Sequence, residues 1–236
     1  MKTISTILLY FTMLCLSPLV HAGDATQLNF IGFADTGDYV AFETYGEHAG
    51  SELPYSAIYI VNVAKNRYAV KPIKSNPRAV AVSSLDEVRA QVLKQAQPQL
   101  DKFFIVPFNQ GQHVISHGLQ DLGINPLSVE FSLYPPIGDY PKTKYKINLK
   151  EIETQESCFG FGKGKKMRLS LLKNGGKVHK LQYDKKLPKT RGCPLAYRIQ
   201  DVFIYDDKKV VVFLNLMLAG YEGQNMRYLA VTGLLP

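Results

Sequence analysis

The 236-residue sequence has no tryptophan, only three cysteines and five histidines, and fewer acidic than basic residues. Without tryptophan it lacks the side chain that stacks best on sugar rings. It also lacks the Gly-x-Ser-x-Gly motif of serine hydrolases and any zinc-binding pattern. Beyond the N-terminal region, no segment approaches the roughly 18 uncharged apolar residues that a membrane-spanning helix needs. We therefore expect no catalytic residues, no metal, no cofactor and no transmembrane segment in the mature chain.

The N-terminal residues resemble an export signal. Lys2 precedes an apolar run over residues 4–16, and Val20-His21-Ala22 places a small residue before Gly23. Signal peptidase requires small side chains just before its cleavage site. The sequence predicts a signal peptide over residues 1–22 that is cleaved near Ala22, and a single β-rich domain over residues 23–236 that is periplasmic or secreted.

Two cysteines, Cys158 and Cys193, remain after Cys15 is removed with the signal. Exported proteins fold in an oxidising compartment, and the pair lacks the Cys-x-x-Cys spacing of redox motifs. We expect a structural disulfide. In the chain-entropy model, closing a loop of this length stabilises the fold by about 4 kcal/mol.

The net charge of +8 comes from one segment of the chain. Residues 142–198 contain 16 Lys and Arg against 4 Asp and Glu, whereas the rest of the mature chain is slightly acidic. Such a segment can bind anionic lipid or glycan. Alternatively, the lysines only coat the solvent face of strands and discourage edge pairing. No nucleic-acid partner is expected, because no stacking motif or arginine-rich helix accompanies the charge.

Strand patterns dominate the mature chain, and one helix stands out. Ser84-Leu85-Asp86-Glu87 has the form of a capping box, and apolar residues follow at helical spacing, so we expect an amphipathic helix over residues 84–97 that Pro98 breaks or kinks. Aromatic and β-branched runs predict strands over residues 28–33, 39–44, 57–63, 113–116, 129–133, 144–151, 167–173, 178–184, 196–205, 210–216 and 228–232.

The beginning and end of the mature chain carry related patterns. NFIGFADTGDYVAFETYGEHAG, followed by SAIYIVNV, is echoed by VFIYDDKKVVVFLNLMLAGYEG, followed by RYLAVTG. Each unit reads as strand, acidic turn, strand, glycine-rich loop and strand. We predict a mainly β fold of antiparallel meanders that form a sandwich or a partial propeller-like array.

These two blocks resemble the predicted secreted protein family known as domain of unknown function 2259. The residues that match the pattern of this family are Gly32, Phe33, Gly37, Phe42, Glu43, Tyr45, Gly46, Gly50, Ser51, Pro54, Tyr55, Gly220, Tyr221, Glu222, Gly223, Arg227 and Ala230. Asn62 departs from the pattern, as do Gln224 and Asn225. The resemblance implies export and assigns no activity.

Two connections, residues 43–55 and 220–227, concentrate glycine, aromatic and charged residues. Binding sites on β scaffolds usually lie in such connections. We expect the two loops to meet at one end of the fold and to form a binding site. The candidate residues are Glu43, Tyr45, Ser51, Tyr55, Tyr221, Glu222 and Arg227.

Glu43 and Glu222 occupy corresponding places in the two related units. Two carboxylates held several ångströms apart are the acid and base of glycoside hydrolases. Arg227 would then bind an anionic substrate or hold one glutamate in place. An envelope hydrolase is thus the alternative to a non-enzymatic protein.

Three further motifs have structural explanations. His113, His117 and Asp121 would share one face of a helix, as metal ligands do, but glycines interrupt that helix and we expect a strand and a loop. Asp35 and Asp38 suit a hairpin turn better than a calcium site, because EF-hand spacing is absent. The stretch CFGFGKGKK at 158–166 lacks Walker spacing and reads as a turn beside the disulfide.

We therefore expect an exported, non-enzymatic binding or scaffold module of the cell envelope, with anionic envelope components as possible partners. The two alternatives are a hydrolase that uses Glu43 and Glu222, and a binder of anionic lipid or glycan through residues 142–198. The identity of the ligand and the oligomeric state do not follow from the sequence.

Overall fold

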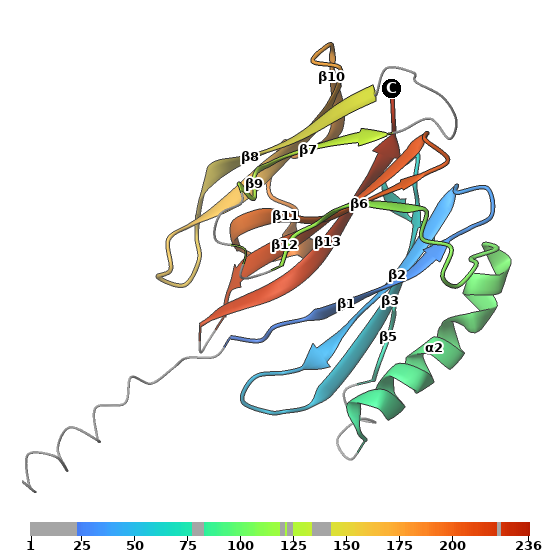
Figure 1. Cartoon of the computed structure of the whole chain (residues 1–236). Coiled ribbons are helices and arrows are strands. Elements are labelled where there is room, and N and C mark those ends of the chain that lie inside the picture. Colours follow the sequence, from blue (N-terminus) through green and yellow to red (C-terminus); the bar gives the residue numbers. More distant parts are fainter. Residues whose placement is uncertain (1–22, 77–82, 119–120, 122–124, 134–142, 221–222) are drawn as a thin grey trace, which may run out of the picture.

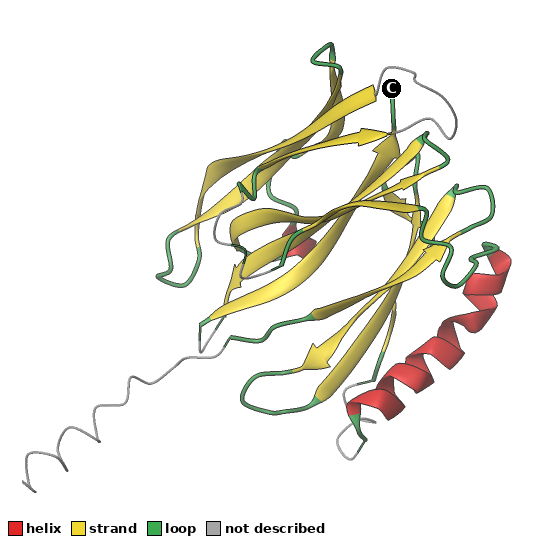
Figure 2. Cartoon of the chain, in the orientation of Figure 1, coloured by secondary structure: helices red, strands yellow, loops and turns green. Residues whose placement is uncertain are grey.

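The computed structural model describes residues 23–76, 83–118, 121, 125–133, 143–220 and 223–236. Its elements form four layers, which are one helix followed by three antiparallel sheets (Figure 1). We call the sheets first, central and outer, counting from the helix. The arrangement confirms the predicted β-rich fold in its sandwich form, and Figure 2 shows how strands dominate it.

The first sheet consists of the N-terminal strands and packs against the helix α2 (Leu85–Lys102). Its strands are β1 (Gln27–Phe33), β2 (Tyr39–Glu47), β3 (Pro54–Asn62), β4 (Arg67–Tyr68) and β5 (Ile73–Lys74), with β4 and β5 both paired to β3. Val92, Ala96 and Leu100 of the helix bury their side chains against Ile58 and Ile60 of β3. The helix therefore covers the face of the first sheet that points away from the central sheet.

The inner strands of the central sheet are buried on both faces. Its strands are, in spatial order, β13 (Gln224–Leu234), β12 (Lys209–Ala219), β11 (Pro194–Tyr205) and β6 (Gln112–Ser116). The run VVVFLNL in β12 is buried throughout, because successive side chains face opposite sheets. β13 lies at one edge of this sheet and β6 at the other.

The outer sheet is covered on one face only. Its strands are, in spatial order, β10 (Val178–Tyr183), β9 (Lys163–Lys173), β8 (Thr143–Ser157) and β7 (Ser128–Leu133). Tyr145, Ile147 and Leu149 point into the core, and exposed lysines alternate with them. The basic segment therefore places much of its charge on the solvent face of this sheet. A short 3-10 turn, η1 (Lys189–Arg191), precedes β11.

The two related sequence units form two facing meanders, β1–β2–β3 and β11–β12–β13. Phe30 and Phe42 from the first meander pack against Phe203 and Phe213 from the second, with ring centroids 4.4 to 5.4 Å apart across the interface. These phenylalanines occupy matching places in the repeated pattern. The repeat therefore creates a core between two sheets.

The acidic turns of the two units also meet. The Tyr205 hydroxyl donates to the Asp35 carbonyl at 2.5 Å, and the Lys209 ammonium lies 3.0 Å from the Asp38 carboxylate. Thr36 bonds to Asp38 within the turn, and Gly37 takes a φ of +67°. Asp35 and Asp38 thus lie in a hairpin turn, and this turn contacts the opposite meander.

The helix continues beyond the expected range of residues 84–97. The capping box at Ser84 and Glu87 is present, but α2 continues through Pro98 to Lys102. Pro98 is exposed, so the carbonyl that loses its amide partner faces water, while the buried stripe of Val88, Val92, Ala96 and Leu100 continues past it. Packing on the first sheet therefore holds the last turn in place.

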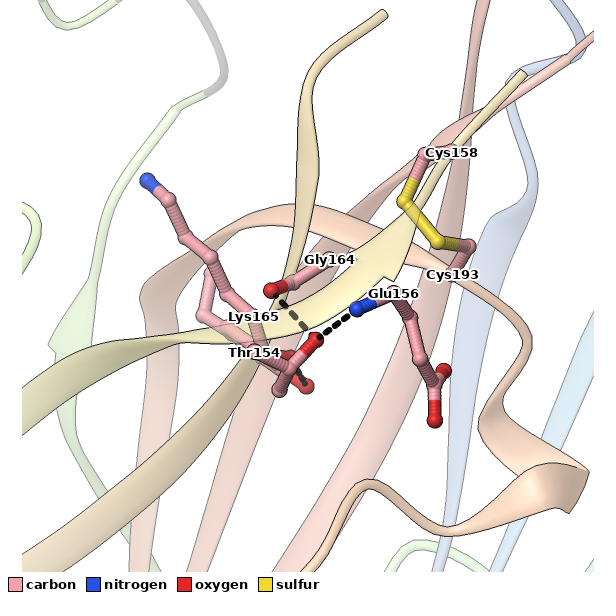
Figure 3. The surroundings of a disulfide bond; sticks show 7 residues. Thr154, Glu156, Cys158, Gly164, Lys165 and Cys193 are labelled. Carbon is pink, nitrogen blue, oxygen red and sulfur yellow. Dashed lines mark hydrogen bonds between the residues drawn. A yellow bond between two sulfur atoms is a disulfide. The ribbon is translucent and has the colours of Figure 1, made fainter. Parts of the chain in front are cut away.

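The predicted disulfide joins Cys158, at the tip of the β8–β9 hairpin, to Cys193, just before β11 (Figure 3). It links the outer sheet to the central sheet. A Cβ on Gly164 would lie 3.1 Å from the Cys193 sulfur, so glycine leaves room for the bridge. The Thr154 hydroxyl donates to the Gly164 carbonyl at 2.9 Å and holds the two strands together beside it.

Candidate functional site

A cavity of about 980 Å³ lies where the three sheets come together along β13. We call it the β13 groove. One wall comes from β2 to β5 of the first sheet, and the other comes from β12 and from the segment between β10 and β11. The residues that line it are Thr26, Thr44, Tyr59, Val61, Asn66, Arg67, Tyr68, Pro72, Lys74, Gln182, Pro188, Thr190, Arg191, Leu216, Leu218, Arg227, Tyr228, Leu229, Ala230 and Val231.

The charged residues that line the β13 groove, among those that the structure describes, are all basic. Arg67, Lys74, Arg191 and Arg227 line it, and none of the lining residues in the described part of the chain is Asp or Glu. Arg191 and Arg227 are held by buried aspartates. Arg67 and Lys74 are exposed, and neither has an ion-pair partner among the described residues. The wall formed by the first sheet therefore presents two available cations.

The edge of β13 is paired at both ends of the groove. The Met226 amide donates to the Asp24 carbonyl at 2.8 Å, and the Met226 carbonyl accepts from the Thr26 amide at 3.2 Å. Farther along, the Thr232 amide donates to the Asn66 side-chain oxygen at 2.9 Å. Met226 and Thr232 therefore point their amides away from β12.

Between these two positions, the same edge has no backbone partner in the described part of the chain. Alternate residues of an antiparallel strand point their N–H and C=O groups to the same side. Because Met226 and Thr232 face outward, Tyr228 and Ala230 face outward as well, and both line the groove. The groove therefore has an open strand edge two residues long at its floor.

Tyrosines give the groove an aromatic surface. Tyr59 and Tyr68 have ring centroids 5.5 Å apart in the wall of the first sheet, and Tyr228 lies in β13. Burial of the phenol, with a smaller contribution from Tyr59, raises the pKa of Tyr68 to about 12, although half of the residue remains accessible. Burial also raises the pKa of Tyr228. Both hydroxyls therefore stay protonated and can donate hydrogen bonds at neutral pH.

A polar cluster around Asp24 closes one end of the groove. Asp24 is only 5% exposed, and its carboxylate lies 2.5 Å from an Arg227 nitrogen. The Tyr55 hydroxyl and a His48 ring nitrogen each lie 3.3 Å from the same carboxylate. Arg227 also donates to the Thr26 hydroxyl at 3.1 Å and lies over the Tyr55 ring. The cluster joins the N-terminal segment, the β2–β3 hairpin and β13.

Glu43 lies on the opposite face of the first sheet and contacts the helix. Arg89 of α2 donates to both of its oxygens, at 3.0 and 2.9 Å. Ser56 and Asn29 donate to these oxygens at 2.9 and 3.2 Å. Arg89 also lies 3.7 Å from the centroid of the Tyr45 ring. The pair therefore fastens the helix to the sheet.

The expectation that Arg227 could hold Glu43 in place was wrong, because the two residues have different partners. β2 turns Phe42 and Thr44 toward the central sheet and hence turns Glu43 toward the helix, where Arg89 holds it. Arg227 holds Asp24 instead. Tyr221 and Glu222 lie outside the described residues.

The predicted site residues thus have different surroundings. Tyr55 and Arg227 come together around Asp24. Tyr45 lies beside Arg89 with Glu43, on the helix side of the sheet. Ser51 is exposed in the turn between β2 and β3. Of the residues named in the two predicted loops, Tyr55 and Arg227 therefore lie together at the end of the groove.

The histidines of the metal hypothesis have separate partners. His113 lies 2.9 Å from the Asp201 carboxylate, stacked on Phe203, and His117 bonds to the Ile199 carbonyl. The Asp121 carboxylate accepts from the Gly118 amide at 2.6 Å. Within the described ranges, no group of three or more His, Cys, Asp and Glu residues could hold a metal ion.

Sequence reasoning missed most of the groove. Arg67 and Lys74 belong to the two-residue strands β4 and β5, which are too short to give a periodic pattern. Asp24 and Thr26 lie between the predicted signal and the first predicted strand, where the sequence shows no periodic pattern. The one available signal was the position of Arg67 directly after the turn that follows the buried strand β3.

Among the residues that the structure describes, no helix combines the length and hydrophobicity needed to cross a membrane. No curated protein and no solved structure is significantly similar to this chain. A family model described as "Predicted secreted protein (DUF2259)" matches residues 41–233. The match covers β2 to β13 and begins after Gly32, Phe33 and Gly37 of the pattern noted in the sequence. Since it spans most of the protein, the chain belongs to this family of predicted secreted proteins.

Proposed function

We propose that residues 23–236 form a non-enzymatic binding module that acts after export and cleavage near Ala22, and that its β13 groove holds an extended acidic peptide segment of another envelope protein. One observation carries the proposal, which is the open edge of β13 on the floor of a groove with cationic walls. The open edge favours an extended ligand backbone, and the cationic walls favour acidic side chains.

The open edge favours a peptide in extended conformation. A peptide that adds a strand to an exposed sheet edge gains main-chain hydrogen bonds, and alternate side chains enter pockets on either side. Tyr228 and Ala230 offer two amides and two carbonyls for such pairing. The existing pairing at Met226 and Thr232 limits the added strand to a short segment.

The walls favour acidic side chains on one face of that peptide. Arg67 and Lys74 lie on the wall formed by the first sheet, and no carboxylate of the described lining residues competes for them. The opposite wall contains Leu216, Leu218 and Pro188, which suit apolar side chains. A strand with alternating acidic and apolar residues matches both walls, because its side chains alternate between its two faces.

The hydrolase alternative receives no comparable support. Four hydrogen bonds occupy the Glu43 carboxylate, and the residue is only 5% exposed. A general acid or base must reach the bond that it acts on. Glu43 therefore serves the packing of the helix in our proposal.

The test uses a defined probe, an acetylated octapeptide of alternating valine and glutamate with a fluorescent label, measured by fluorescence polarisation. Two derivatives carry N-methyl groups on all valines or on all glutamates. Strand addition uses the amides of one parity only. We expect one derivative to lose binding by tenfold or more and the other to bind as the parent peptide does. Equal affinity of the two derivatives would contradict strand addition.

Charge reversal tests the cationic wall. The double variant Arg67→Glu and Lys74→Glu should weaken binding of the parent peptide by about tenfold, since each exposed ion pair is worth up to about 1 kcal/mol and reversal adds repulsion. Lys94→Glu, on the exposed side of α2, is the matched control and should leave binding unchanged. A groove variant that binds like the control would remove the basis for an acidic ligand.

A second candidate function is binding of an anionic surface through the basic segment, residues 142–198. The outer sheet favours it, because basic side chains gather on its solvent face. They are Lys144, Lys146, Lys150, Lys166, Arg168 and Lys180, and Glu130 pairs with Lys146 on the same face. Its test is binding to anionic vesicles that weakens steeply as salt increases. Binding that does not respond to salt would rule it out.

A further inference from the structure

The tip of the β8–β9 hairpin carries two exposed phenylalanines. Phe159 is 86% exposed and Phe161 is 47% exposed. Together with Gly160 and Gly162 they form the turn between Cys158 and Lys163, which we call the hairpin tip. Single exposed apolar residues are common on proteins, but two large ones on a projecting turn usually mark an interaction site.

The hairpin tip is held in a defined shape. Cys158 is fully buried, and its amide donates to the Gly162 carbonyl at 2.8 Å. Its carbonyl accepts from the Phe161 amide at 2.9 Å. The disulfide ties this turn to the start of β11. The two phenylalanines therefore project from a braced turn, so that little conformational entropy is lost when they are buried.

The surroundings of the hairpin tip are rich in lysine. Lys163 follows the tip directly and is exposed. The segment that leads to Cys193 runs beside β9, since the Asp184 amide donates to the Met167 carbonyl and Lys166 donates to the Lys185 carbonyl. The exposed cations of these segments are Lys163, Lys185, Lys186 and Lys189, and the exposed acids on the strand before the tip are Glu153 and Glu156. The basic face of the outer sheet continues this positive region.

We propose that the hairpin tip docks the protein on an anionic lipid bilayer, with Phe159 and Phe161 inserted at the boundary of headgroups and acyl chains and the neighbouring lysines on the lipid phosphates. This inference deepens the second candidate function and is independent of the groove. Apolar side chains ringed by lysines bind membrane interfaces because burial of apolar area and attraction to anionic lipid add together.

The phenylalanines select a bilayer among anionic surfaces. A hydrated anionic glycan offers charge to the lysines but no apolar layer into which both rings could pass. In a bilayer interface, each ring leaves water, and burial of a phenylalanine side chain is worth about 1.5–3 kcal/mol. The lysines of the sheet face contribute binding energy that salt screens. The phenylalanines of the tip contribute binding energy that persists at high salt, because burial of apolar area is not screened.

The first test exploits the absence of tryptophan. The variant Phe159→Trp introduces a single tryptophan at the tip, and Phe108→Trp places one in the α2–β6 connection, where Phe108 is 90% exposed and also has a positive φ. Excitation at the red edge of the absorbance avoids the tyrosines. On vesicles of phosphatidylglycerol and phosphatidylethanolamine, we expect a blue shift and protection from aqueous quencher for Trp at 159 and neither effect for Trp at 108. Vesicle-bound protein whose tip tryptophan keeps the emission of water would overturn the insertion and leave the sheet-face function standing.

The second test measures affinity by vesicle sedimentation. Phe159→Asn with Phe161→Ser should weaken binding by about tenfold or more, because both ring contributions are lost. Phe108→Asn is the matched control and should bind as the unmodified protein does. If the tip variant binds like the control at both low and high salt, the hairpin tip is not the docking element. If no version binds anionic vesicles at low salt, the second candidate function fails together with this inference.

Discussion

Two arginine–carboxylate pairs, Glu43–Arg89 and Asp24–Arg227, lie on opposite sides of the first sheet. Both carboxylates are about 5% exposed, and both arginines remain partly exposed. Arg89 saturates Glu43 together with two neighbouring side chains and fixes the helix. Arg227 shares Asp24 with Tyr55 and His48 and forms the end of the β13 groove.

The comparison shows that similar chemistry serves different purposes according to what lies beside it. Arg89 belongs to the helix α2 and binds Glu43 of the first sheet, so its charge serves the packing of the helix. Arg227 lines a groove together with other basic side chains, so its charge also contributes to the positive electrostatic potential of the groove. We infer that the first pair matters for stability alone, and the second for both stability and ligand binding.

Replacement of Glu43 should lower the free energy of unfolding more than any other change considered. Glu43→Ala leaves Arg89 without its main partner and removes a buried acceptor, so we expect the free energy of unfolding to fall by about 3 kcal/mol. Urea denaturation measures it. Asp86→Ala is the control, because Asp86 lies 4.0 Å from Arg89 but is almost fully exposed. Peptide binding by the folded fraction should not change, and a loss of binding without a loss of stability would place Glu43 in the site.

Loss of the Asp24 charge should separate the two roles of the second pair. Asp24→Asn keeps the shape but leaves Arg227 without a counter-charge, so we expect a fall in stability of about 2 kcal/mol. The valine–glutamate octapeptide should bind several-fold more tightly, because Arg227 becomes available to it. Weaker binding by the folded variant would indicate that Asp24 supports the groove mainly through its geometry. Asp38→Asn, in the exposed turn, is the control for both measurements.

High pH should lower the stability least, and tyrosines on the groove side contribute to this effect. Burial raises the pKa of Tyr55, Tyr68 and Tyr228 above the ordinary value of 10. Above about pH 10 the unfolded chain loses these protons before the folded chain does, so stability falls as pH rises further, toward the folded pKa of about 12 for Tyr68.

Titration of tyrosinate absorbance in the folded protein measures this effect. Tyr228→Phe should remove one late-titrating group and make the fall in stability less steep. Tyr39→Phe, on the helix side of the first sheet, is the comparison. Tyrosines that all titrate as free phenols would contradict the burial of the groove hydroxyls.

The β-rich fold was predictable because its signals are local. Each observed long strand overlaps a predicted run, and the acidic turns of the two related units lie where turn chemistry placed them. The similarity of the two meanders also followed from sequence, whereas the face-to-face packing of Phe30, Phe42, Phe203 and Phe213 did not. Strand patterns specify which side chains are buried but not which sheet covers them.

The candidate site was predictable only in part. Tyr55 and Arg227 were named from sequence, and they share Asp24 in the fold. Glu43 was named for its match to Glu222, but strand alternation directs it to the helix and Arg89. Arg67 and Lys74 gave no periodic signal, because a two-residue strand has no periodicity. Contacts between residues far apart in the sequence determine which side chains meet in the site, and such contacts produce no pattern of fixed spacing in the sequence.

The sequence by itself determined that this protein is rich in antiparallel strands, has one capped amphipathic helix and a disulfide, and resembles a secreted family. These properties depend on local periodicity, turn residues and cysteine count. Only the tertiary structure decided that β13 is an edge strand, that its outward amides at Tyr228 and Ala230 face a cationic groove, and that Arg227 belongs to Asp24. The physical reason is that an open edge and an ion pair are relations between distant segments, which form only when the sheets pack.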